Sequence, residues 1–226
     1  MVSGEWCVDE YYITGKLKRM GRESEIFFMT WRASNSDNIG LAYSTIEPQS
    51  DVFLVPKVID SSRLFFDFEI RNVKVSSGGL VEIDKDELDG KGKVDYQPNN
   101  FAWPIVSVKM KQIIDSVSTA ADCISWVQTS LLFNQRDYDY FVLVFNRSYD
   151  VIDEHKTLYI NKANNHILKP HFSLKKIQDL ELSLFRKPFS HNYERITPGI
   201  FVTGKLRKHL LEAGVSGIKF EKVAAS

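Results

Sequence analysis

IFVTGKLRKHLLEAGVSGIKFEKV, residues 200–223, has the pattern of a strand, a helix and a second strand. Thr203 stands where a helix N-cap belongs, because its hydroxyl can accept from a backbone N–H that the first turn leaves without a partner. Leucines recur behind it on one side, which predicts a short amphipathic helix over residues 204–213. Gly214 suits the left-handed conformation that often ends a helix, and Ile218 begins an apolar run that predicts a closing strand.

The same order of residue types occurs earlier, in residues 104–114 (PIVSVKMKQII). Ser107 corresponds to Thr203 as the hydroxyl cap, and a lysine, an apolar residue and a basic residue follow in both places. The pattern predicts a second capped helix over Val108–Val117. We expect each helix to pack its apolar stripe on a sheet. Caps of this kind recur by chance, so no duplication is inferred.

Several other segments are rich in strand-forming residues. Residues 64–75 (LFFDFEIRNVKV) alternate apolar and polar side chains, with a change of phase at Asn72 and Val73 that predicts a bulge or a turn. Residues 52–55 are a short apolar run that ends at Pro56. The remaining predicted strands are residues 6–13, 26–31, 123–133, 138–145, 157–160, 166–168 and 182–185. Together these patterns predict an α+β or mixed α/β protein, with mixed or antiparallel sheets and a few short packed helices.

Residues 76–100 have the weakest pattern, with several glycines and the acidic run DKDELDG from Asp84. The run does not match a calcium-binding EF-hand loop, because Leu88 occupies a ligand position and the glycine comes one place late. We interpret it as an exposed connection. A boundary near residue 97 would divide the chain into a β-rich half, residues 1–97, and an α/β half, residues 98–226, unless the two form one continuous domain.

The composition excludes several classes of protein. Lys and Arg number 29 and so do Asp and Glu, which argues against a nucleic-acid-binding protein with its usual basic excess. The two cysteines lie far apart, so neither a disulfide framework nor a zinc ribbon is expected. The start of the chain lacks a secretory signal pattern. Apolar runs of about five residues fall far short of the ~20 that span a bilayer. We expect a cytoplasmic protein without membrane contact.

No pattern of a known catalytic or metal site is present. The five histidines have neither zinc-finger nor zincin spacing, and no GxSxG, P-loop or GxGxxG motif occurs. We therefore predict that the chain binds no metal, needs no cofactor and is not an enzyme. The alternative is a small enzyme or ligand-binding domain with an unfamiliar site.

The order of several short pieces resembles a known group. They are Asp95-Tyr96, residues 103–107 (WPIVS), residues 140–143 (YFVL), residues 184–186 (LFR) and the closing unit, residues 201–220. This order is similar to that in immunity proteins of bacterial polymorphic toxin systems, the group that includes the Myxococcus-type immunity domains. The similarity covers roughly residues 64–223. It implies an inhibitor that binds a cognate toxin domain, without specifying the contact residues or the oligomeric state.

Three stretches are candidates for partner contact. Aromatic and charged residues alternate in residues 137–140 and again in residues 185–191, and such residue types anchor interfaces. The favoured interpretation of the first stretch is the irregular start of a strand, and the alternative for the second is a loop that only covers the protein. The third candidate is acidic, and its four carboxylates could steer the chain towards a basic cleft of a toxin. These are Asp84, Asp86, Glu87 and Asp89. The alternative for the acidic stretch is an ordinary solvated loop.

Overall fold

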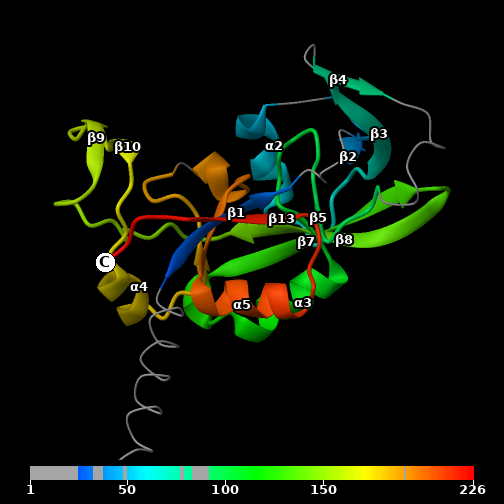
Figure 1. Ribbon diagram of the computed structural model, residues 1–226. Helices are drawn as coiled ribbons and strands as arrows, with labels where there is room; N and C mark the ends of the chain where they lie inside the picture. Colours follow the sequence, from blue (N-terminus) through cyan, green and yellow to red (C-terminus); the bar gives the residue numbers. More distant parts are fainter. Residues whose placement is uncertain (1–24, 33–37, 48–49, 77–78, 83–91, 191) are drawn as a thin grey trace, which may run out of the picture.

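The computed structural model describes residues 25–32, 38–47, 50–76, 79–82, 92–190 and 192–226. Two of the predictions made from the sequence lie outside these residues, namely the strand over residues 6–13 and the acidic stretch from Asp84 to Asp89. The described part is an α+β structure with two main sheets, a separate two-stranded sheet and four short helices (Figure 1).

The larger sheet is mixed and has seven strands. Its order is β2-β3-β7-β8-β6-β5. The strand β4 pairs with residues 73–76 of β3, whereas β7 pairs with residues 68–69 of the same strand. Among the described strands, only β3 and β7 pair in parallel. Asn134 and Gln135 join β7 to β8, and both have a positive φ (50° and 60°), as a two-residue hairpin turn requires. The strands are β2 (Asn38–Ser44), β3 (Phe68–Ser76), β4 (Gly79–Glu82), β5 (Tyr96–Gln97), β6 (Ile105–Ser107), β7 (Ile124–Phe133) and β8 (Arg136–Phe145).

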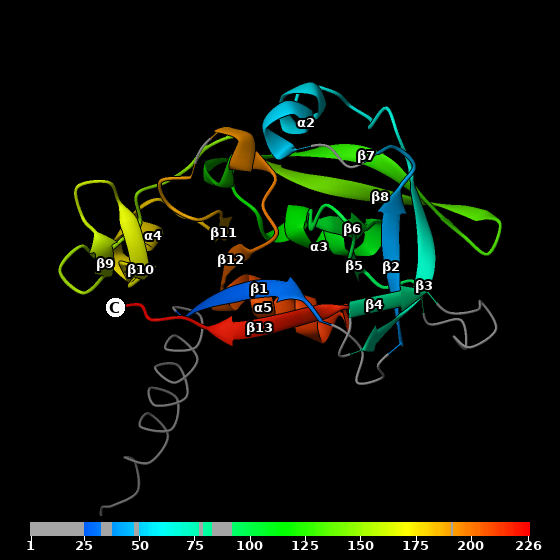
Figure 2. The ribbon, with the colours of Figure 1, turned by 90° about the horizontal axis from the view of Figure 1, so that it is seen from above.

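The smaller sheet is antiparallel, with the order β11-β12-β1-β13. Its members are β1 (Ile26–Trp31), β11 (Leu184–Phe185), β12 (Ile200–Thr203) and β13 (Ile218–Lys222). Because β1 pairs with strands from the end of the chain, both main sheets combine strands from the two sides of residue 97. The division into halves at that residue stays a prediction. A hairpin of β9 (Leu158–Asn161) and β10 (His166–Lys169) lies apart from both sheets (Figure 2).

Two helices occur where the capped patterns predict them: α3 (Val108–Val117) and α5 (Gly204–Glu212). The hydroxyl of Ser107 accepts from the N–H of Met110 at 3.2 Å, and that of Thr203 accepts from the N–H of Leu206 at 3.5 Å. The two helices lie side by side below the sheets (Figure 1), and their apolar stripes are buried in one cluster with residues of both sheets. The prediction of two capped helices on sheets is confirmed.

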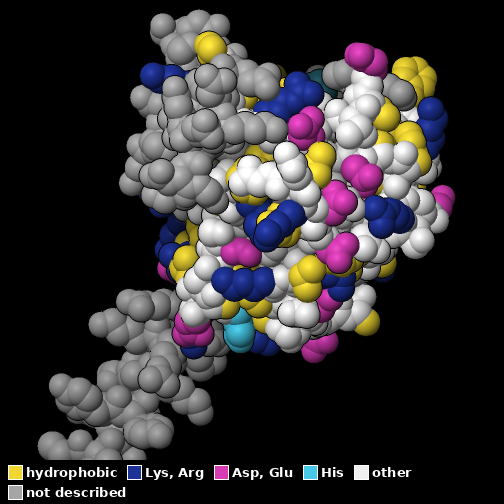
Figure 3. All heavy atoms as spheres, turned by 90° about the vertical axis from the view of Figure 1, so that its right-hand side faces the viewer, with side chains coloured by type: hydrophobic (Ala, Val, Ile, Leu, Met, Phe, Trp, Pro, Cys, Tyr) yellow, Lys and Arg dark blue, Asp and Glu magenta, His cyan; other side chains and the backbone are white. Residues whose placement is uncertain are grey.

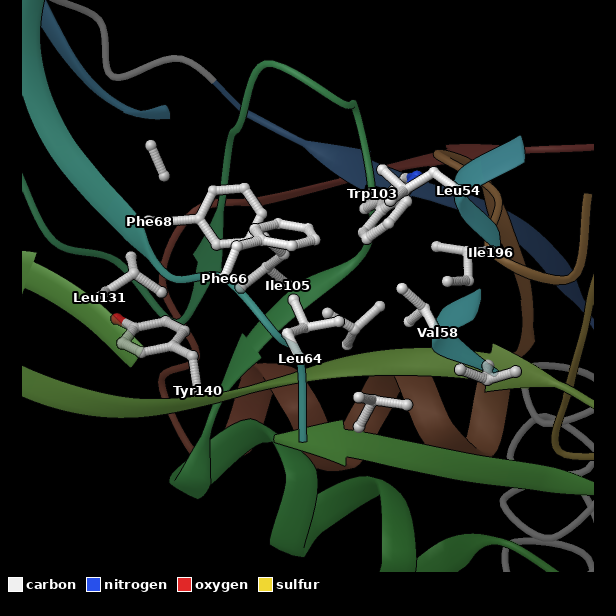
Figure 4. Close-up of a cluster of buried hydrophobic side chains, with 14 of the residues drawn as sticks. Leu54, Val58, Leu64, Phe66, Phe68, Trp103, Ile105, Leu131, Tyr140 and Ile196 are labelled. Atoms are coloured by element: carbon white, nitrogen blue, oxygen red, sulfur yellow. The ribbon is translucent and has the colours of Figure 1, made fainter. Parts of the chain in front are cut away.

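A second apolar core lies on the other side of the larger sheet, around Trp103 (Figure 4). The helix α2 (Asp51–Val58) covers it with Leu54, Val55 and Val58. Aromatic rings from two segments meet here: the Trp103 ring stacks on Phe101, and Phe66 contacts both. The fourth helix, α4 (Leu174–Asp179), belongs to a third core cluster near the end of the chain.

Two local expectations differ from the structure. Pro56 ends the apolar run of residues 52–55 in the sequence but does not end the element. The helix α2 continues through it to Val58, whose side chain is buried in the core. The change of phase at Asn72 and Val73 is neither a bulge nor a turn, since β3 keeps regular register with β2. Val73 is buried there against Ile39 and Leu41. Apolar residues are thus accommodated on both faces of that end of β3.

Candidate functional site

The best-formed polar cluster in the described residues is centred on Asp95, just before β5. The hydroxyl of Ser107 donates to Asp95 Oδ1 at 2.6 Å, while the N–H and the hydroxyl of Ser216 both donate to Oδ2 at 2.9 Å. One carboxylate therefore joins the start of β5, the N-cap of α3 and the turn before β13. Ser107 serves twice, because the same oxygen that donates to Asp95 caps the helix.

The surroundings of Asp95 favour its ionised form. Partial burial by itself would raise the pKa of the carboxyl, but the hydrogen bonds from Ser107 and Ser216 outweigh burial, with help from the Lys109 ammonium 3.7 Å away, and hold the pKa below its usual value. Lys109 also donates to the carbonyl of Gly214 at 3.0 Å, just after α5. Lys109 thus connects the start of α3 both to Asp95 and to the end of α5.

A groove of about 440 Å³ opens beside this cluster. The ammonium of Lys93 lies 3.7 Å from the centre of the Tyr138 ring, which is a cation–π contact. The hydroxyl of Tyr140 donates to the carbonyl of Val94 at 2.8 Å, and burial raises the pKa of this tyrosine well above its usual value. Asp137 and Asp139 are exposed at the rim. The predicted contact stretch at residues 137–140 therefore divides into a buried Tyr140, a half-buried Tyr138 that packs against the core, and the exposed Asp137 and Asp139.

Other residues of the short pieces that carry the resemblance also stabilise the fold. Trp103 donates from its ring nitrogen to Asp51 at 3.1 Å, and Tyr96 donates from its hydroxyl to the carbonyl of Pro198 at 3.1 Å. Burial raises the pKa of Asp51, although the hydrogen bond from Trp103 opposes this shift. In residues 184–186, all three side chains are buried, including Arg186. The sequence pointed to these positions without revealing that their role is to hold segments together.

A second carboxylate, Asp122, is fully buried and has a similar role that the sequence did not indicate. It accepts from the backbone N–H groups of Thr119 (2.8 Å), Ser183 (2.7 Å) and Leu184 (3.1 Å). Burial raises its pKa, and these three hydrogen bonds oppose the shift. A cavity of about 480 Å³ lies nearby, between α4 and the start of α5, with mainly apolar walls. A Thr-x-x-Asp pattern, which forms a capping box here, was the one local signal for Asp122.

The histidines do not gather into a site in the part of the chain that the structure describes. His155, His166 and His209 are exposed at separate places, and His171 contacts Ser226 at 3.0 Å. His191 lies outside the described residues. Within those residues, no three His, Cys, Asp or Glu side chains are arranged to hold a metal ion. The absence of a metal and of a cofactor stays a prediction.

The fold and the Asp95 cluster define an α+β protein whose main polar network connects its own sheets and helices. Residues 80–225, more than half of the 226-residue chain, match the Immunity protein family (Imm11). The chain therefore belongs to this family of immunity proteins, as the order of its short motifs indicated. No curated protein matches the chain. None of the helices within the described ranges has the length and apolar character needed to cross a membrane.

Proposed function

We propose that this chain protects a bacterial cell by binding a cognate toxin domain and blocking it. The observation that carries the proposal is the match of residues 80–225 to an immunity protein family. The geometry supports it indirectly, because the motif residues Asp95, Trp103 and Ser107 serve the framework. Recognition of one particular toxin would then rest on exposed residues, which can differ between relatives without loss of the fold.

The test is co-expression with candidate toxin domains encoded by genes that neighbour this one. We expect growth to be rescued and the two purified proteins to elute as one complex in size-exclusion chromatography. An unrelated toxin domain serves as the control and should be neither rescued nor bound. Failure of the wild-type chain both to rescue growth and to bind any neighbouring toxin domain would refute the proposal.

A titration separates an inhibitor from the alternative, a small enzyme that inactivates the toxin chemically. A blocking protein should abolish toxin activity only when the molar ratio reaches one to one. A modifying enzyme would act at a small fraction of that ratio and leave the toxin inactive after separation. We expect stoichiometric inhibition that is reversed when the complex is dissociated.

The acidic stretch, Asp84, Asp86, Glu87 and Asp89, is proposed as one part of the contact surface. Its support is its charge: four carboxylates within six residues favour a basic partner surface, such as the cleft of a toxin that acts on nucleic acid or nucleotides. The proposed setting is the cytoplasm, with a toxin protein as the partner and without a role for nucleic acid or a membrane.

A further inference from the structure

The hairpin of β9 and β10 is the most separate element among the described residues. Its two strands pair only with each other in that part of the chain, and they lie at one end of the molecule, away from both main sheets (Figures 1 and 2). The hairpin is nevertheless well anchored. Thr157 and His171 at its base exchange two hydrogen bonds, of 3.2 and 3.0 Å, and Lys162 at its tip forms an ion pair with Glu154 at 3.5 Å.

One face of the hairpin packs on the protein and the other carries exposed aliphatic side chains. Tyr159 and Ile167 are register partners and are half-buried, and Ile167 packs on the core cluster around Phe172. The three aliphatic residues on the remaining positions are largely exposed: Leu158 by 56%, Ile160 by 72% and Leu168 by 65%. Exposed apolar faces on strands with open edges promote association, so proteins usually protect them with charges or prolines.

One lysine of the hairpin lacks a compensating charge. Lys156 is paired with Asp153 at 3.7 Å and Lys162 with Glu154 at 3.5 Å. Within the described part of the chain, Lys169 has no ion-pair partner, and it is the register partner of Leu158. The face in Figure 3, on the opposite side of the molecule, has Lys and Arg interspersed with Asp and Glu. The hairpin therefore combines an aliphatic centre with one uncompensated lysine.

We propose that the hairpin face, defined as Leu158, Ile160, Leu168 and Lys169, is a docking site for the toxin domain. This inference rests on the proposed function. Its occupant is a protein surface with an apolar patch bordered by carboxylates, because such a surface complements both the aliphatic centre and the lysine. A second copy of this chain fits less well, since a symmetric pairing of hairpins would bring the lysines of both copies together.

The experiment measures binding of hairpin variants to the toxin domain that the co-expression test identifies. Ile160→Ala combined with Leu168→Ala removes the aliphatic centre, and Lys169→Glu reverses the charge. Matched controls lie on α2, where Phe53 is 68% exposed and Lys57 is also exposed: Phe53→Ala and Lys57→Glu. All these positions are on the surface. Circular dichroism melting curves are the check that each variant is folded.

We expect the aliphatic double variant to raise Kd at least tenfold, mainly through faster dissociation. Lys169→Glu should slow association several-fold at low salt, and the difference should shrink at 0.3 M salt. The α2 controls should stay within twofold of the wild type.

Each other outcome has a definite meaning. Wild-type affinity in all hairpin variants would place the toxin contact elsewhere and leave the proposed function intact. If the wild-type chain itself forms no complex, the proposed function fails, and this inference fails with it. A dimer seen by analytical ultracentrifugation and abolished by the double variant would assign the face to a second copy. Hairpin-dependent binding to vesicles of phosphatidylglycerol and phosphatidylcholine, without an effect on toxin affinity, would assign it to a membrane.

Discussion

Asp95 illustrates how much a single carboxylate can do in this fold. Its two oxygens accept three hydrogen bonds from Ser107 and Ser216, and Lys109 compensates its charge. Ser216 lies 121 residues away in the chain. Hydrogen bonds to a charged group contribute more than those between neutral groups, and a partner left unsatisfied costs more still. The short piece of sequence that contains Asp95 is thus explained by a structural role.

The first prediction concerns stability and pH. The folded pKa of Asp95 is lowered, so its contribution to stability is fully present above the unfolded pKa, about 3.9, and is lost as the pH falls through the folded value. Asp95→Asn should therefore lower the free energy of unfolding by about 1–2 kcal/mol at pH 7. The difference in the free energy of unfolding between Asp95→Asn and the wild type should narrow between pH 5 and pH 2.

Urea unfolding at a series of pH values measures this difference. Asp137→Asn, at an exposed position on the rim of the same groove, is the matched control and should change stability by less than about 0.5 kcal/mol. A stability difference between Asp95→Asn and the wild type that does not vary with pH would contradict the assignment.

In both α3 and α5, the last residue of the preceding strand is the hydroxyl N-cap of the helix. Each cap accepts a hydrogen bond from the third helical N–H, which would otherwise lack a partner inside the helix. The two caps differ in what else they contact. Thr203 serves its own helix, whereas Ser107 also donates to Asp95 at 2.6 Å. The two caps have similar local sequences but differ in how much they contribute to the stability of the fold.

The second prediction compares the two caps directly. Thr203→Ala should lower the free energy of unfolding by about 1 kcal/mol, the usual value for a lost N-cap. Ser107→Ala should cost about 2 kcal/mol, because it removes the cap and one partner of a charged group. Chemical denaturation of both variants tests the order. Equal losses would show that the bond between Ser107 and Asp95 adds nothing to stability.

At the scale of the whole molecule, the two toxin-contact stretches that we propose have opposite character. The hairpin face combines aliphatic side chains with lysine, while the acidic stretch from Asp84 to Asp89 concentrates carboxylates. Oppositely charged surfaces on one inhibitor would discriminate among toxins, since a wrong partner places like charges together. The effect of the hairpin face on affinity and that of the acidic stretch on the association rate can then be measured separately.

The third prediction tests the acidic stretch by its effect on the association rate. Replacing Asp84, Asp86, Glu87 and Asp89 with their amides should slow binding of the toxin at low salt and flatten the dependence of the rate on salt. Stopped-flow measurements at low and moderate salt give both quantities. Unchanged rates would show that the stretch is an ordinary solvated loop and would leave the hairpin prediction unaffected.

The sequence by itself predicted features that depend on neighbours along the chain. The bounds of α3 and the two caps follow from hydroxyl caps and apolar spacing, and the strands β8, β9 and β10 lie within about two residues of their predicted positions. The order of short motifs further indicated the immunity protein family, which the match over residues 80–225 shows. Interactions within a few residues decide such features, so they are visible in a linear pattern.

Other features depended on segments that only folding brings together. The helix α2 continues through Pro56 because Leu54, Val55 and Val58 fill the core beside Trp103. Val73 changes the phase of β3 because Ile39 and Leu41 cover that face. The exposed side of the hairpin is decided by the cluster around Phe172, which buries the other side. Burial by distant residues outweighs local preference in each case, because the apolar area removed from water is set by the assembled fold.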